Sequence, residues 1–175
     1  MKSLISVSIN NTAFQSAKSF ELKELEALET VDIGDDCFNS AEAFSLNGSI
    51  ERRKWRKDLP RLQSVRLGEK AFRVATSFAM SNLTSLQSID FGSGCFGGYY
   101  EQNERKWIGG ASSFSLIGIV GLMNWEIDLP QLQSVKLGNN AFQVAKSFEM
   151  SKLTSLQSVE FGHWCFGGYY GYYVN

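Results

Sequence analysis

The sequence predicts a β-rich repeat solenoid in which a parallel β-sheet runs through stacked coils. Three observations predict this fold. Residues 59–100 recur seventy residues later as residues 129–170, with 30 of 42 positions identical. Each copy contains two units whose first leucines lie 24 residues apart, and the same apolar positions recur in every unit. Because so small a unit buries little apolar surface alone, its stability must come from stacking on its neighbours.

The coils follow one another in a fixed frame that is interrupted by insertions. Three of the five steps between first leucines are 24 residues long, and the other two are 34 and 46. We place the insertions at residues 47–57, 97–113 and 117–127, and we treat residues 1–175 as a single solenoid domain. The six coils start at Leu4, Leu28, Leu62, Leu86, Leu132 and Leu156.

The first half of each coil predicts a strand whose apolar side chains enter the core. Counted from the first leucine, positions 1, 4, 6 and 11 are apolar throughout; in the third coil they are Leu62, Val65, Leu67 and Phe72. A second apolar run, such as residues 77–80, alternates with period two, which favours a second short strand over a helix. An irregular or 3-10 segment is the alternative. All thirteen phenylalanines fall at repeating positions, as is typical of a core.

The turn after the first strand has its own regular positions. Position 7 is Asn10 in the first coil and glycine in the other five, and these residue types tolerate positive φ best. We therefore interpret position 7 as the turn that leaves the strand. Position 8 is polar in every coil, from Asn11 to His163, and we expect it to be an exposed turn position that accepts any polar residue.

The outward face of the predicted sheet is polar. Position 2 holds glutamine in four coils and position 3 holds serine in five, so stacked coils would form amide and hydroxyl rows that hydrogen-bond to like neighbours. Position 5 alternates in sign from Asp32 to Glu160, which places opposite charges on adjacent strands. These patterns favour a surface whose polar and charged groups pair with one another. The alternative is a polar face that binds a partner.

The L-x-S-V-x-L stretch, such as residues 62–67, resembles the leucine-rich repeat. The Ala-Phe or Cys-Phe pair at positions 10 and 11 is most similar to the BspA-like variety of that family. The resemblance covers essentially the whole chain, and it implies a right-handed coil and a protein-binding module, often on cell surfaces. The chain departs from the family at position 9, where Asn or Cys is usual and this chain has residues as different as Lys70 and Trp164.

The residues that carry most catalysis and metal binding are scarce. Cys37, Cys95 and Cys165 all occupy position 10, where the other coils have alanine, so we interpret them as small core residues. They lie two coils apart, which is too far for a disulfide. The sequence has a single histidine, His163, and no G-x-S-x-G motif that would supply a nucleophilic serine for it. The glycine pairs match no phosphate-binding motif. We therefore predict no catalytic residue, no metal site, no cofactor and no enzyme activity.

The overall charge and hydropathy exclude two further classes of partner. The chain has a net charge of -1, which does not supply the basic field of generic nucleic-acid binding. Its longest nearly uncharged apolar stretch, residues 114–123, is about half the length of a membrane-spanning helix. No signal peptide is visible at the N-terminus. Unpaired cysteines favour a reducing compartment, whereas the family resemblance favours the cell surface.

Large aromatic residues outside the repeating core are the candidate binding residues, because such residues are the usual anchors of protein interfaces. Our first hypothesis is that the chain is a noncatalytic protein–protein interaction module. It would bind through the aromatic residues of the insertions and through the solenoid edge. The alternative is a structural protein that stacks end to end on copies of itself, because neither end of the solenoid has a polar cap. The candidate residues are Trp55, Tyr99, Tyr100, Trp107, Trp125, Tyr169 and Tyr170.

Overall fold

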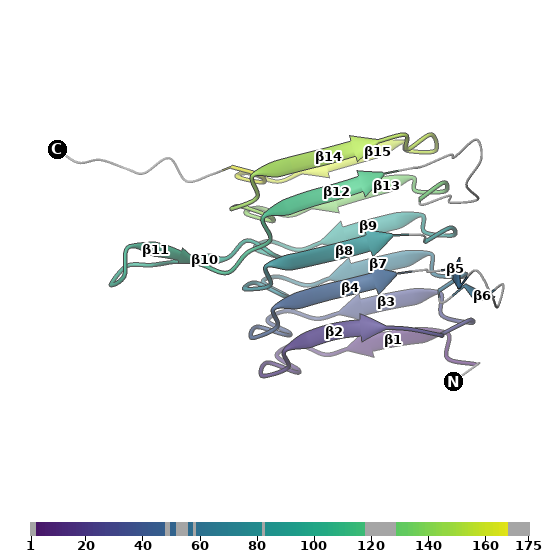
Figure 1. Ribbon diagram of the computed structural model, residues 1–175, viewed down its shortest axis with the longest axis horizontal. Helices are drawn as coiled ribbons and strands as arrows, with labels where there is room; N and C mark the ends of the chain where they lie inside the picture. The colour runs from purple at the N-terminus through teal and green to yellow at the C-terminus, as the bar shows by residue number, and fades with distance from the viewer. Residues whose placement is uncertain are drawn as a thin grey trace.

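The protein is described by a computed structural model covering residues 3–47, 50–51, 56–57, 59–81, 83–117 and 129–167. Every regular element in these ranges is a β-strand. Two layers of parallel strands run through a stack of repeats (Figure 1), which we number one to six from the six leucines named above. The predicted parallel-sheet repeat is therefore present.

One parallel sheet contains the first strand of each repeat. It pairs equivalent positions across repeats, for example Val7 with Val31 and Val31 with Val65. The 34- and 46-residue steps preserve this register, because Asp32 pairs with Arg66 and Asp90 with Lys136. In spatial order its strands are β1 (Ser6–Ile9), β3 (Thr30–Ile33), β7 (Ser64–Leu67), β9 (Ser88–Phe91), β13 (Ser134–Leu137) and β15 (Ser158–Phe161).

The second apolar run of each described repeat is also a strand, as its period of two predicted. β2 (Ser19–Leu22), β4 (Ala43–Asn47) and β8 (Ser77–Ser81) form a three-stranded parallel sheet. β12 (Ser113–Ile117) pairs with β14 (Ser147–Ser151) in the same direction. Phe78 stacks on Phe114 with ring centroids 5.7 Å apart, so these two sheets continue one another. Three residues assigned above to insertions belong to strands instead: Asn47 ends β4, and Ser113 and Ile117 begin and end β12.

Two antiparallel hairpins lie within the insertions. The first consists of β5 (Ile50–Glu51) and β6 (Arg56–Lys57). The second consists of β10 (Tyr99–Glu101) and β11 (Lys106–Ile108), and it projects from the side of the stack (Figure 1). Both hairpins interrupt the stack without breaking the register of the strands on either side.

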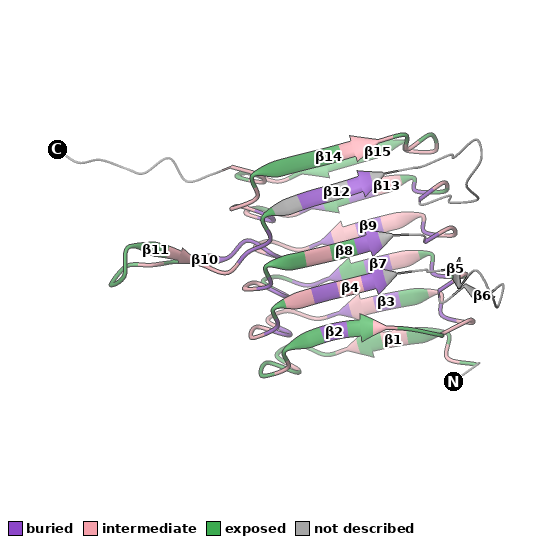
Figure 2. Cartoon of the chain, viewed as in Figure 1, coloured by how far each residue is buried: buried purple, intermediate pink, exposed green. Residues whose placement is uncertain are grey.

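The core consists of side-chain columns that run along the stack, and buried residues occur on strands of both layers (Figure 2). The clearest column is formed by the position-11 phenylalanines. Neighbouring rings in it lie 4.7 to 5.9 Å apart and are nearly parallel. Offset stacking at this distance adds to the free energy gained by burial. The column runs through Phe14, Phe38, Phe72, Phe96, Phe142 and Phe166.

Position 7 directly follows the first strand, as predicted, but it does not have the positive φ that its residue types tolerate. No position-7 residue has positive φ. The six position-11 phenylalanines have positive φ instead, between 52° and 56°. All six position-9 residues also have positive φ. Glycine is required at position 7 because the preceding repeat lies too close for a side chain. A Cβ built on Gly68 would lie 2.5 Å from the backbone nitrogen of Asp35.

Position 8 has a more specific role than the sequence suggested. The side-chain oxygens of Asn11, Asp35 and Asn139 each accept a hydrogen bond from the backbone N–H of position 8 in the next repeat, at 2.7 to 2.9 Å. The backbone N–H of position 9 donates in turn to a position-8 carbonyl of the next repeat, as from Thr12 to Asp35. Short polar side chains at position 8 therefore help to join successive repeats.

Candidate binding surfaces

Hairpin β10–β11 is attached to the stack by close backbone contacts. The N–H of Gly98 donates to the carbonyl of Arg73 at 2.8 Å, and the guanidinium Nε of Arg73 donates to the carbonyl of Gly98 at 3.1 Å. On the returning strand, a Cβ built on Gly109 would lie 2.4 Å from the Cα of Val74. Glycine at both feet of the hairpin thus allows a contact with repeat three that fixes where the hairpin leaves repeat four.

Tyr100 and Trp107 form a cross-strand pair on this hairpin. They are directly opposite partners in the antiparallel register. Their ring centroids lie 5.9 Å apart in an edge-to-face arrangement, and 45% of the Tyr100 surface is exposed. Neighbouring residues of a strand point to opposite faces, so Tyr99 and Glu101 lie on the other face. The pair therefore presents an aromatic surface outside the repeating core.

Tyr99 contributes to the attachment of the hairpin. The guanidinium carbon of Arg73 lies over its ring, 5.2 Å from the centroid. This cation–π contact adds to the two hydrogen bonds between Arg73 and Gly98. Of the three described candidates, Tyr99 anchors the hairpin to the stack, whereas Tyr100 and Trp107 face away from that anchor.

The other four candidate residues, Trp55, Trp125, Tyr169 and Tyr170, lie outside the described residues. The structure therefore brings together only the three aromatic residues of one insertion. The sequence identified these three by composition but did not predict that Tyr100 and Trp107 are paired.

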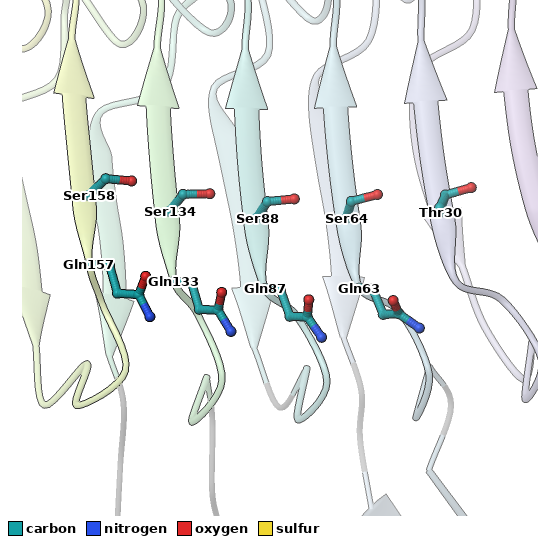
Figure 3. Close-up of a pocket in the computed structure, with 9 residues that line it drawn as sticks. All are labelled: Thr30, Gln63, Ser64, Gln87, Ser88, Gln133, Ser134, Gln157 and Ser158. Carbon is teal, nitrogen blue, oxygen red and sulfur yellow. The ribbon is translucent and has the colours of Figure 1, made fainter.

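A second candidate surface is a shallow hollow on the outward face of the six-stranded sheet (Figure 3). Its volume is about 310 Å³, and its lining is entirely uncharged and polar. Serine hydroxyls point in a common direction along one side, and glutamine amides lie parallel along the other. The lining residues are Thr30, Gln63, Ser64, Gln87, Ser88, Gln133, Ser134, Gln157 and Ser158.

The expected hydrogen bonds between like neighbours of these rows are not present among the residues that line the hollow. Backbone bonds join the strands instead, as from the N–H groups of Gln87 and Ser88 to the carbonyl of Gln63. The charged row beside the hollow does form pairs: Arg66 contacts Asp32, and Lys136 contacts Glu160, each at 3.2 Å. The charged row thus alternates three carboxylates with two cations, and the amide and hydroxyl groups beside it are left to solvent.

The three cysteines pack as small core residues and are free thiols. Each donates its S–H to the carbonyl of position 7 in the preceding repeat: Cys37 to Asn10 and Cys95 to Gly68 at 3.0 Å, and Cys165 to Gly138 at 3.1 Å. Burial raises the pKa of all three thiols. A raised pKa lowers the thiolate population, which is the opposite of what a nucleophilic cysteine needs.

The remaining groups form no recognisable reactive cluster in the part of the chain that the structure covers. His163 is exposed in a turn, where its backbone N–H donates to the side chain of Asn139 and its carbonyl accepts from the N–H of Asn140. No group of three or more His, Cys, Asp or Glu residues in the described ranges is placed to hold a metal ion. Nor does any helix in those ranges have the length and apolar character needed to cross a membrane.

Comparison with protein-family models, curated proteins and solved structures yields no match to this chain.

Proposed function

We propose that this chain is a leucine-rich-repeat-like solenoid, coiled in the right-handed sense, and that it acts as a noncatalytic protein–protein interaction module. The observation that carries the proposal is the paired Tyr100 and Trp107 on a hairpin that projects from the stack. The repeats form a scaffold, and the hairpin provides the contact surface.

The chemistry of the pair favours a protein partner. Tyrosine and tryptophan are enriched among the residues that dominate binding energy at protein interfaces, because they combine a large apolar surface with a polar group. The contacts of Gly98, Gly109 and Arg73 fix the base of the hairpin before binding. A fixed base lowers the entropy lost when a partner docks.

The absence of catalysis is part of the same proposal. Its support is the raised pKa of the three thiols and the exposed position of the only histidine. A nucleophile needs an adjacent base or a lowered pKa, and the described residues supply neither to these groups.

Site-specific photo-cross-linking tests the proposed surface. A photoreactive residue in place of Tyr100, in extract of the cells that make the protein, should yield a discrete cross-linked product. The same residue in place of Gln133, which is exposed on the polar sheet face, is the matched control. A discrete product from both positions, or from the control alone, would contradict the proposal.

The cross-linked protein, once identified and purified, permits a quantitative test. Trp107→Ala should raise its Kd at least about thirtyfold, which corresponds to about 2 kcal/mol at an interface hot spot. Glu101→Ala, on the other face of the same hairpin, should change Kd less than about threefold. Equal effects of the two substitutions would show that the aromatic face is not the contact.

A further inference from the structure

Position 7 of the repeat frame sets the first repeat of the stack apart from the other five. Repeats two to six have glycine at position 7, and repeat one has Asn10. In the described part of the stack, strand β1 of repeat one ends the sheet order, and each of the other five repeats packs on the repeat before it. In this stack, position 7 is thus glycine in every repeat that packs on a preceding repeat, and asparagine in the repeat at the end.

Each position-7 glycine packs directly on the backbone of the preceding repeat. A Cβ built on Gly138 would lie 2.5 Å from the nitrogen of Ser93, and one on Gly162 would lie 2.5 Å from the nitrogen of Asn139. All five glycines have a backbone atom of the preceding repeat within 2.7 Å of the added carbon. These atoms belong to hydrogen-bonded turns, so they cannot move aside as the end of a flexible side chain could.

The face at the other end of the stack has the chemistry of a face that does receive a repeat. Residues 83–97 and 153–167 differ at only four positions. In repeat four, Ile89 and Phe91 are covered by repeat five and are 1% and 0% exposed. Their counterparts in repeat six, Val159 and Phe161, are 45% and 41% exposed. This face, formed by β15 and the turn after it, therefore presents the apolar surface that repeat five covers elsewhere.

The backbone groups of the two ends are complementary as well. Between repeats four and five, the carbonyls of Gln87, Phe91 and Cys95 accept from positions 2, 7 and 11 of the next repeat. Within the described ranges, the equivalent carbonyls at the end of the stack, those of Gln157, Phe161 and Cys165, accept no such bond. At the other end, the equivalent N–H groups of Ile5, Asn10 and Phe14 donate none. Phe14 and Phe166 also end the same phenylalanine column. In the layer of first strands, the backbone groups of a second copy would therefore be complementary head to tail, and Asn10 is the position-7 side chain that stands in the way.

We propose that Asn10 keeps copies of this protein apart. Its Cβ occupies the space where the turn of repeat six in another copy would lie, so the C-terminal face accepts a repeat with glycine at position 7 and rejects the first repeat of a second copy. Head-to-tail contacts of this kind do not close on themselves and lead to fibres. A single side chain at one end would prevent such growth.

The test restores glycine at this position. Asn10→Gly should give a molar mass that rises with protein concentration when light scattering is measured on a size-exclusion column. The unchanged protein and Asn10→Ala should stay at 19.6 kDa over the same range. Asn10→Ala is the matched control because it removes the amide but keeps the Cβ. Adding Phe161→Glu to Asn10→Gly should return the mass to 19.6 kDa, because the carboxylate would be buried in the junction.

Three results would overturn the proposal. They are growth of the unchanged protein, growth of Asn10→Ala to the same extent as Asn10→Gly, and a constant mass for Asn10→Gly whose thermal unfolding shows that it is folded. The outcome is independent of the proposed hairpin surface, because Tyr100→Ala and Trp107→Ala added to Asn10→Gly should leave the growth in mass unchanged.

Discussion

The thiol of Cys95 donates to the carbonyl of Gly68 across 3.0 Å, although the two residues lie 27 positions apart in the chain. Cys37 and Cys165 make the same bond to position 7 of the repeat before them. Position 10 is alanine in repeats one, three and five and cysteine in repeats two, four and six. The alternation of alanine and cysteine thus marks a two-repeat unit within the stack.

The buried position of Cys95 predicts slow thiol chemistry. Burial raises the pKa of its thiol above the ordinary value of 9.0, and the side chain has no exposed surface. A disulfide reagent at pH 8 should therefore leave Cys95 unmodified in the folded protein and should modify all three cysteines in denaturant. Mass spectrometry of the labelled peptides measures this. Rapid native labelling of Cys95 would contradict the packing.

The same pKa shift predicts a loss of stability in alkaline solution. The folded state keeps the Cys95 proton at pH values where the unfolded chain has lost it, so the contribution is full below pH 9.0 and falls as the pH rises further. The melting midpoint should decline between pH 9 and about 11, and the decline should be smaller in Cys95→Ala. An identical decline in both proteins would exclude this thiol as a cause.

The phenylalanine column predicts a steep dependence of stability on position. Phe72→Ala should lower the free energy of unfolding by about 3 to 5 kcal/mol, because Phe72 is fully buried between two rings. Phe14→Ala should cost much less, since 60% of Phe14 is exposed at the end of the column. Denaturant unfolding measures both values. Equal losses would contradict the column.

The turn after the first strand predicts opposite effects for two substitutions two residues apart. Gly68→Ala should destabilise by about 1 to 3 kcal/mol, because the added methyl group overlaps the backbone of repeat two. Lys70→Gly should be neutral or stabilise by up to about 1 kcal/mol, because Lys70 has a φ of 56°. Glycine adopts this conformation without the steric cost but loses more chain entropy on folding. Destabilisation by both substitutions would contradict the described backbone.

Much of the fold could be predicted because identical side chains must meet when identical repeats stack. The 24-residue frame aligned Val7 with Val31 and Phe14 with Phe38, and the structure pairs and stacks them. Position 7 was placed correctly at the turn after the first strand, but the reason for its glycine was not predicted, because residue statistics associate glycine with positive φ. Its real cause is a close approach to the preceding repeat, which only the three-dimensional register reveals.

The candidate site was only partly predictable for a related reason. The repeat frame identified residues 97–113 as an insertion rich in aromatic residues, but the frame carries no information about pairing outside the core. The cross-strand pair of Tyr100 and Trp107 depends on the local hairpin register. Likewise, the glutamine and serine rows were located correctly, whereas their hydrogen bonds depend on side-chain conformations that a repeat pattern does not specify.

Thermal unfolding of the double variant Tyr100→Ala/Trp107→Ala tests the central claim, that this hairpin pair serves binding rather than folding. Because the pair lies outside the core columns, the melting midpoint should change by less than about 2 °C, which is below about 1 kcal/mol for a chain of this size. A fall of about 8 °C or more would mean that the pair holds the stack together, and it would contradict the account.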